Sequence, residues 1–103
     1  MHYKLIITER AEELLDGLVR YLLYRIKNQQ AALHLLESIE KLYDRLEYNP
    51  FQYPFCKDEY LLQKEYREAV LTDMNYLVIY KVEDENVYVL GVFHELEQYK
   101  NKL

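Results

Sequence analysis

Residues 73–93 read DMNYLVIYKVEDENVYVLGVF, and this stretch decides the fold. Its segment 76–82 (YLVIYKV) is rich in the β-branched and aromatic residues that favour strands, and segment 87–93 (VYVLGVF) has the same character. The polar segments 73–75 and 83–86 are typical of turns. Because strands joined by a short turn pair antiparallel, the stretch predicts a β-hairpin.

Two further strands are predicted outside this hairpin. Residues 65–71 lead into the turn at 73–75, so they form an antiparallel three-strand meander with the hairpin. Residues 3–8 (YKLIIT) form a fourth strand at the start of the chain. Its Leu-Ile-Ile run favours an inner position in the sheet, because inner strands are shielded on both faces.

Between these first and second strands, the apolar residues recur at helical spacing and predict two amphipathic helices. Thr8 can cap the first helix, whose first turn is acidic, and Asn28 breaks the pattern after it. Asn49-Pro50 ends the second helix, because proline disfavours helix in the residue before it. A link this short folds the helices into an antiparallel hairpin. The apolar stripes are Ala11, Leu14, Leu15, Leu18, Leu22 and Ile26 in the first helix and Ala32, Leu35, Leu36, Ile39, Leu42, Tyr43 and Leu46 in the second.

Together these elements predict an α+β fold of order β-α-α-β-β-β. The antiparallel helical hairpin is expected to pack on one face of a four-stranded, mostly antiparallel sheet. At 103 residues the chain has room for a single domain, residues 1–103. The aromatic segment 51–58 is expected to pack against that domain, and the tail 95–103 to form a short helix.

The composition indicates the cellular compartment of the protein and the kinds of partner that it can bind. The single cysteine, Cys56, has no partner for an internal disulfide, which fits a reducing compartment. No stretch approaches the roughly 20 apolar residues of a membrane span, so a cytoplasmic protein is expected. A net charge of −5 and a pI near 5.2 argue against strong nucleic-acid binding. With one Cys and scattered His residues, neither a zinc site nor a cofactor is expected.

Several stretches of the chain carry a resemblance to a known family. Tyr66-Arg67 lies in a predicted strand, residues 75–82 form a tyrosine-rich central strand, and the last strand ends in His94. This order resembles the RelE/ParE toxin superfamily, and Tyr3-Lys4-Leu5 and Asn49-Pro50 match it as well. The resemblance implies the toxin half of a bacterial type II toxin–antitoxin pair, neutralised by an antitoxin that wraps around it. RelE-like members cut mRNA in the ribosomal A site without a metal, whereas ParE-like members act on DNA gyrase.

The resemblance also implies where functional residues lie. In a RelE-like enzyme Arg67, His94 and Tyr99 would be catalytic, because metal-free RNA cleavage needs an acid–base group and cations for the phosphorane. Here Glu95 and Glu97 stand where RelE-like enzymes crowd Arg and Lys. Carboxylates at that place repel phosphate, which favours a ParE-like toxin acting by protein contact.

For contact with the target or the antitoxin, the candidates are Arg67, Tyr76, Tyr80 and His94. Each also has a structural interpretation. Arg67 can pair with flanking glutamates on the sheet surface, His94 can pack at the end of its strand, and the tyrosines can pack across strands. Tyr99 is open between packing and function. The mixed charges of the helices, Lys41 and Arg45 among them, predict solvated faces.

Three functions therefore remain open at this stage. The first is a toxin that acts by protein–protein contact, with DNA gyrase as the favoured target. The second is a ribosome-dependent, metal-free mRNA endonuclease. The third is an inactive toxin that keeps the fold as an antitoxin-binding, regulatory module.

Overall fold

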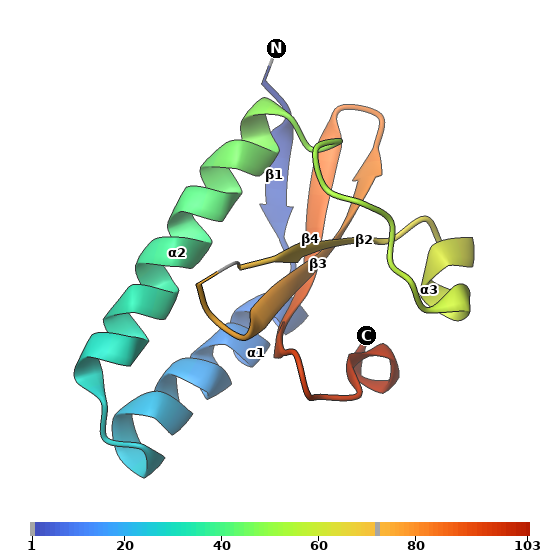
Figure 1. The fold of residues 1–103 in the computed structure, drawn as a ribbon. Coiled ribbons are helices and arrows are strands. Elements are labelled where there is room, and N and C mark those ends of the chain that lie inside the picture. Colours follow the sequence, from blue (N-terminus) through green and yellow to red (C-terminus); the bar gives the residue numbers. More distant parts are fainter. Residues whose placement is uncertain (1, 72) are drawn as a thin grey trace.

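The structure, a computed structural model, describes residues 2–71 and 73–103. Figure 1 shows a twisted sheet with the long helix α2 on one side and the short helix α3 at the opposite end of the molecule. The predicted α+β order is confirmed, with α3 as an additional element. In chain order the elements are β1 (Lys4–Ile7), α1 (Glu9–Arg20), the π-helical turn η1 (Tyr21–Arg25), α2 (Gln29–Tyr48), α3 (Glu59–Gln63), β2 (Arg67–Val70), β3 (Tyr76–Glu83), β4 (Asn86–His94) and the 3₁₀ turn η2 (Tyr99–Lys102).

The sheet has the strand order β1-β4-β3-β2. Strands β2, β3 and β4 form the predicted antiparallel meander. The turn between β3 and β4 places Asp84 at φ 55°, a left-handed conformation that Asp adopts more readily than most residues. Strand β1 lies beside β4 and runs parallel to it, which makes the sheet mixed but mostly antiparallel, as expected.

The predicted inner position of the first strand is wrong, because β1 lies at an edge of the sheet. Only its β4 side is paired: the Lys4 N–H donates to the Glu85 carbonyl at 2.8 Å and the Thr8 N–H to the Val89 carbonyl at 3.1 Å. Helices cover its apolar run instead, since Leu5 is half-buried and packs against the core between the helices and the sheet. A short apolar run therefore indicates that a strand is shielded from solvent. Here the helices provide that shielding, and not a second neighbouring strand.

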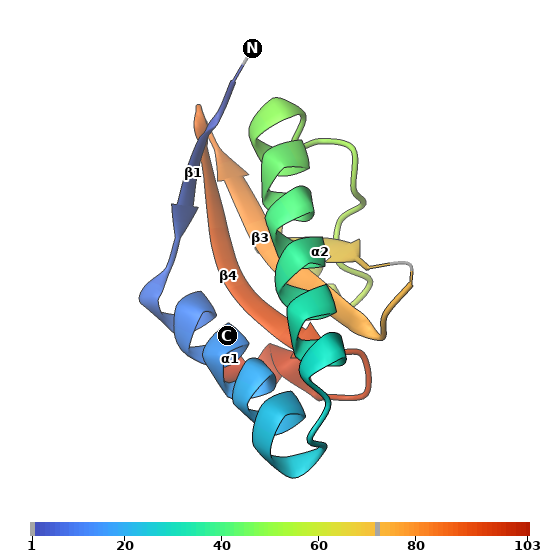
Figure 2. The ribbon, with the colours of Figure 1, turned by 90° about the vertical axis from the view of Figure 1, so that its left-hand side faces the viewer.

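The helical hairpin covers one face of the sheet, as predicted. The Thr8 hydroxyl accepts the Ala11 N–H at 3.1 Å and caps α1. Figure 2 shows α2 lying along the strands β4 and β3. The π-helical turn η1 winds more loosely than an α-helix, so Ile26 turns out of the predicted apolar stripe and is exposed. Leu36, also assigned to a stripe, is exposed too. The buried α2 side chains that meet the sheet are Ala32, Leu35, Ile39, Leu42 and Leu46.

The opposite face of the sheet carries a smaller apolar cluster. Leu77, Ile79 and Phe93 project there and meet Cys56 from the connector and Leu61 from α3. Burial is the main cause that raises the pKa of the Cys56 thiol to about 12, with nearby carboxylates adding to it, so the thiol stays protonated. Among the described residues, no helix has both the length and the apolar character needed to cross a bilayer.

The connector between α2 and α3 packs on the sheet, as predicted for residues 51–58. Phe55 forms an isolated antiparallel bridge with Arg67, and the Cys56 N–H donates to the Tyr66 carbonyl at 2.8 Å. On the same side, the Glu68 N–H donates to the Pro54 carbonyl at 3.0 Å. The connector thus covers the outer edge of β2 over its first half.

Candidate functional site

His94 and Tyr76 lie opposite each other at one end of the sheet. They are register partners on β4 and β3, and their rings meet edge to face with centroids 5.3 Å apart. The Nδ1 atom of His94 accepts the Leu96 N–H at 3.2 Å, which fixes the orientation of the imidazole. Burial first, and then the nearby Glu97 carboxylate, raise the pKa of Tyr76, so its hydroxyl stays protonated. The bond from the Leu96 N–H and the contact between the two rings thus hold the pair together at this end of the sheet.

This pair forms one wall of a depression of about 480 Å³, which we call the Tyr76–His94 depression. Tyr21 and Leu96 stand at its rim, and both are largely exposed, Leu96 to 88%. The complete lining is Leu18, Tyr21, Tyr76, His94, Leu96 and Glu97, so no Arg or Lys of the described residues takes part. Its character is apolar and aromatic, with a single carboxylate and a single imidazole.

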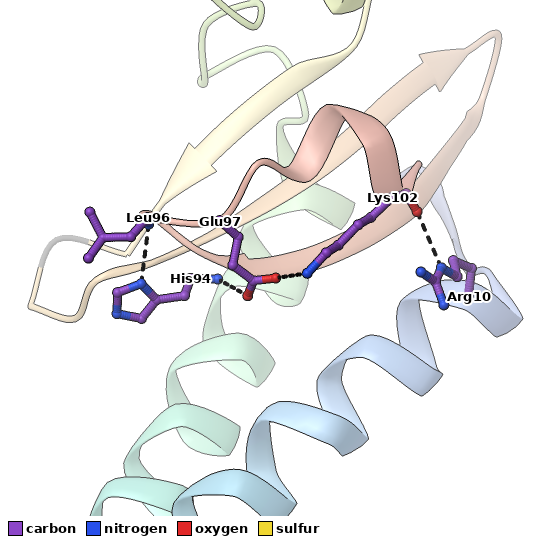
Figure 3. A network of polar contacts seen from close by, with 5 residues as sticks. All are labelled: Arg10, His94, Leu96, Glu97 and Lys102. Atoms are coloured by element: carbon purple, nitrogen blue, oxygen red, sulfur yellow. Dashed lines mark hydrogen bonds and ion pairs between the residues drawn. The ribbon is translucent and has the colours of Figure 1, made fainter.

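Glu97 connects the C-terminal tail to the end of β4. Figure 3 shows its carboxylate between the backbone of His94 and the side chain of Lys102. The His94 N–H donates to Glu97 Oε1 at 3.0 Å, and Lys102 Nζ donates to Oε2 at 2.6 Å. Arg10 Nε in turn donates to the Lys102 carbonyl at 3.2 Å, which ties the tail to α1. Burial opposes ionisation of Glu97, but the bonds from Lys102 and His94 outweigh it and lower its pKa.

Arg67 is the first residue of β2, away from the end of the sheet where Tyr76 and His94 meet, and the connector between α2 and α3 holds its side chain. Its Nη1 donates to the Tyr53 carbonyl at 2.6 Å. The guanidinium carbon lies 4.0 Å from the centroid of the Phe55 ring and 5.3 Å from that of Phe51. Two exposed aromatic rings and one carbonyl thus fix the guanidinium. The sequence had also suggested that Arg67 pairs with flanking glutamates, but the ion pairs of the described residues include no such pair.

Tyr80 is a core residue. Its side chain is fully buried, and its hydroxyl donates to the Pro50 carbonyl at 2.6 Å. Burial raises its pKa above the ordinary tyrosine value, although the Arg67 charge partly opposes this. A direct contact between Tyr80 and a partner would first require this core to open.

The structure brings Tyr76 and His94 together but keeps Arg67 and Tyr99 apart from them. Arg67 pairs with Tyr80, four residues along β3 from Tyr76, which is roughly 13 Å at about 3.3 Å per residue. Tyr99 stacks on Phe93 with centroids 5.5 Å apart, on the face opposite the hairpin. The catalytic trio suggested by the resemblance, Arg67, His94 and Tyr99, therefore does not converge on one point.

These features define what the site can do. The aromatic depression can accept an apolar side chain, and the imidazole of His94 supplies a polar group at its wall. A phosphate group there would meet no Arg or Lys among the lining residues. Within residues 2–71 and 73–103, no three His, Cys, Asp or Glu side chains are grouped to hold a metal ion.

A second surface was missed from the sequence. A groove of about 360 Å³ runs between α2 and the β2 side of the molecule, and we call it the α2–β2 groove. Lys41 and Arg45, assigned to a solvated helix face, both line it. Their spacing of four residues places them on one helix face and could have drawn attention to them. The carboxylates of Glu37 and Asp73 lie in the same groove, whose complete lining is His34, Glu37, Ser38, Lys41, Arg45, Tyr53, Val70, Leu71 and Asp73.

Comparison with known proteins bears on identity. Residues 5–99 match the family model described as the ParE toxin of the type II toxin–antitoxin system, parDE. No curated protein gives a significant match. Among solved structures, the chain is similar to one titled "Chromosomal ParDE TA system from P. aeruginosa", with a TM-score of 0.72 and 17% identity over 90% of this chain and 96% of that chain. This likeness supports the fold. Because the family model spans nearly the whole chain, the protein belongs to the ParE toxin family of type II toxin–antitoxin systems.

Proposed function

We propose that this ParE-family toxin arrests growth by binding DNA gyrase and is neutralised by a cognate antitoxin. Membership of the family supports a toxin, and the similar structure is titled as a ParDE toxin–antitoxin system. Both the target and the neutralising partner would be met in the cytoplasm. The activity would then reside in a contact surface rather than in bond-breaking residues.

The apolar Tyr76–His94 depression is the observation that carries this proposal. Protein contacts favour aromatic side chains around a pocket that an apolar anchor can fill. Tyr21, Tyr76 and Leu96 supply such a surface, with the tail fixed beside them by Glu97. We place the target contact here, with His94 as the polar group that orients it.

Ribosome-dependent mRNA cleavage has weaker support from the geometry. Cleavage without a metal needs cations around the scissile phosphate and an acid–base pair within hydrogen-bond reach of the reacting atoms. Arg67 is separated from His94 by roughly 13 Å along the sheet at about 3.3 Å per residue, and its guanidinium is held by Tyr53. Tyr99 lies on the other face of the sheet.

The experiment that separates these functions follows macromolecular synthesis after induction of the protein. Gyrase inhibition is expected to stop thymidine incorporation before methionine incorporation, whereas mRNA cleavage reverses that order. Co-expression of the cognate antitoxin should restore growth. Normal growth after induction of a folded protein, or methionine incorporation that stops first, would contradict the proposal.

A matched pair of variants locates the contact. Leu96→Ser removes the most exposed apolar side chain at the rim of the depression and should reduce growth arrest. Leu62→Ser makes the same change at an exposed position on α3 and should leave growth arrest unchanged. Equal toxicity of both variants would place the target contact elsewhere.

A further inference from the structure

Strand β1 leaves one side of its backbone open. Its Lys4 N–H donates to the turn before β4, and the Thr8 N–H that follows the strand donates to β4 itself. Because alternate residues of a parallel ladder face the neighbouring strand, the N–H and C=O groups of Leu5 and Ile7 face away from β4. In the part of the chain that the structure describes, no backbone group outside the sheet bonds to Leu5 or Ile7. Figure 2 shows β1 at the margin of the molecule, with no other described element on its outer side.

The two edges of the sheet are protected to different degrees. At the far edge the connector covers the first half of β2. Edge strands are commonly protected from pairing by a proline, a bulge or charged side chains. Strand β1 contains no proline, its register with β4 is regular, and Lys4 is its only charged residue. Its other residues, Leu5, Ile6 and Ile7, are apolar and half-buried. This edge is therefore suited to pairing with a further strand.

Ile6 has no place in the apolar clusters of the described residues. Leu5 and Ile7 pack against the core beneath the helical hairpin. Since side chains alternate along a strand, Ile6 points to the other face of the sheet, where it joins neither cluster. A strand on the outer side of β1 would cover part of Ile6 and would make β1 an inner strand, the position that an apolar run favours.

The charges at the two ends of β1 indicate which strand fits. Lys4 begins the strand and Glu9 follows its end, and both side chains are exposed. Neither forms an ion pair with a described residue. A second β1 in antiparallel orientation brings Lys4 of each copy beside the end of the other strand, where Glu9 lies. A parallel orientation would instead bring like charges together. The edge is thus complementary to itself in one orientation.

We propose that two copies of this chain pair through β1, antiparallel, about a two-fold axis at Ile6. The pairing joins the two four-stranded sheets into one continuous sheet. Leu5 of each copy lies opposite Ile7 of the other, and each of these pairs exchanges both N–H···O=C bonds. The Ile6 residues face each other on the axis, with Cα atoms about 4.5 Å apart. This contact goes beyond the proposed target binding, since β1 pairs only with Asn86–Val89 of β4 and leaves the Tyr76–His94 depression free.

Sedimentation velocity of the purified full chain, from about 1 to about 300 μM, tests whether the dimer forms, because a small interface is expected to be weak. The dimer fraction should rise with concentration. Leu5→Pro removes an outward N–H that β4 does not use, and proline is tolerated at such edge positions. It should weaken the dimer about tenfold or more. Leu5→Ala is the matched control, since it shortens the side chain but keeps the N–H, and it should dimerise more strongly than Leu5→Pro.

Charge reversal tests the orientation of the two strands. Lys4→Glu and Glu9→Lys should each weaken the dimer about fivefold or more, because each places like charges beside one another. The double variant Lys4→Glu/Glu9→Lys exchanges the two charges and should dimerise within about twofold of the unmodified protein. These variants leave the strand backbone unchanged, so they decide the question even if Leu5→Pro fails to fold.

A cysteine on the two-fold axis tests the register. Ile6→Cys should form an intermolecular disulfide on mild oxidation, because the expected Cα separation lies within the range that a disulfide spans. The natural Cys56 is 1% exposed and does not compete. Leu62→Cys, at an exposed position on α3, should cross-link far more slowly. A protein that stays monomeric over the whole concentration range, a dimer that neither charge reversal weakens, or equal cross-linking at positions 6 and 62 would overturn the proposal and leave the proposed function intact.

Discussion

The buried hydroxyl of Tyr80 donates a hydrogen bond of 2.6 Å to the backbone carbonyl of Pro50. This bond joins the central strand β3 to the turn that ends α2, two segments 30 residues apart in the chain. A buried carbonyl without a donor costs free energy, so the phenol hydroxyl stabilises the place where the connector leaves the helix. The same connector holds Arg67 through the Tyr53 carbonyl, and the bond of Tyr80 therefore also supports the position of the Arg67 guanidinium.

Tyr80→Phe should lower the free energy of unfolding by about 1–3 kcal/mol, because the Pro50 carbonyl loses its buried donor. Tyr88→Phe is the matched control, since the Tyr88 side chain is half-buried and its hydroxyl has only a 3.5 Å contact from Asn86. Its effect should stay within about 0.5 kcal/mol. Urea unfolding measures both, and equal midpoints for the two variants would contradict the structural role of the Tyr80 hydroxyl.

Arg67→Ala should also destabilise the protein, by about 1–2 kcal/mol, because it removes the bond to Tyr53 and the contact with the Phe55 ring. Arg67→Lys keeps the charge but lacks the planar guanidinium, so it should recover only part of the loss. Chemical denaturation is measured alongside growth arrest. If Arg67 served only to contact a partner, both variants would unfold like the unmodified protein and lose only activity.

Gly91→Ala should destabilise the sheet by about 1–3 kcal/mol. A Cβ atom at position 91 would lie 2.5 Å from Phe93 Cε2 and 3.1 Å from Leu14 Cδ1, and the Phe93 ring is fully buried and stacked on Tyr99. Gly17→Ala provides the control, because a Cβ there meets nothing within 4 Å. In the helix α1 that change should stabilise by about 0.5–1 kcal/mol. Effects of the same sign in the two variants would refute this packing.

Glu97 should make stability depend on pH in the acid range. Its pKa in the folded protein is lowered, so its contribution is complete above the ordinary carboxyl pKa and is lost as pH falls through the lower, folded value. The difference in Tm between the unmodified protein and Glu97→Gln should therefore shrink as pH falls from neutral to strongly acidic. Glu95→Gln, at an exposed position, should show no such trend. A constant difference across that range would mean that the Lys102 and His94 bonds do not act on this carboxylate.

Local patterns in the sequence were sufficient to predict most helices and strands, but they did not predict how these elements are placed next to one another. The β-branched and aromatic residues of segment 76–82 predicted β3, and the cap at Thr8 predicted the start of α1, because both signals depend on near neighbours in the chain. The position of β1 depended on which element shields Leu-Ile-Ile, and a helix and a strand shield equally well. The helix α3 has five residues, too few to show a helical period.

The candidate site shows the same division. A regular register counted from the turn would place Tyr76 opposite Phe93, and only the irregularity between Ile79 and Tyr80 brings His94 opposite Tyr76. The pairing of Tyr76 with His94 therefore could not be derived from the turn and the strand lengths alone. The positions of Arg67 and Tyr99 depend on the connector and the tail. These segments are irregular, so no periodic pattern in the sequence predicts where they run. The resemblance grouped Arg67, His94 and Tyr99 by their order in the chain, whereas the sheet separates them by face and by distance.

The most direct test of the account measures DNA supercoiling by purified gyrase in the presence of the purified, folded protein. We expect supercoiling to fall and covalent gyrase–DNA cleavage complexes to accumulate as the protein is added, with both effects reduced for Leu96→Ser and reversed by the antitoxin. Unchanged supercoiling and unchanged cleavage-complex levels at a protein excess would contradict the account.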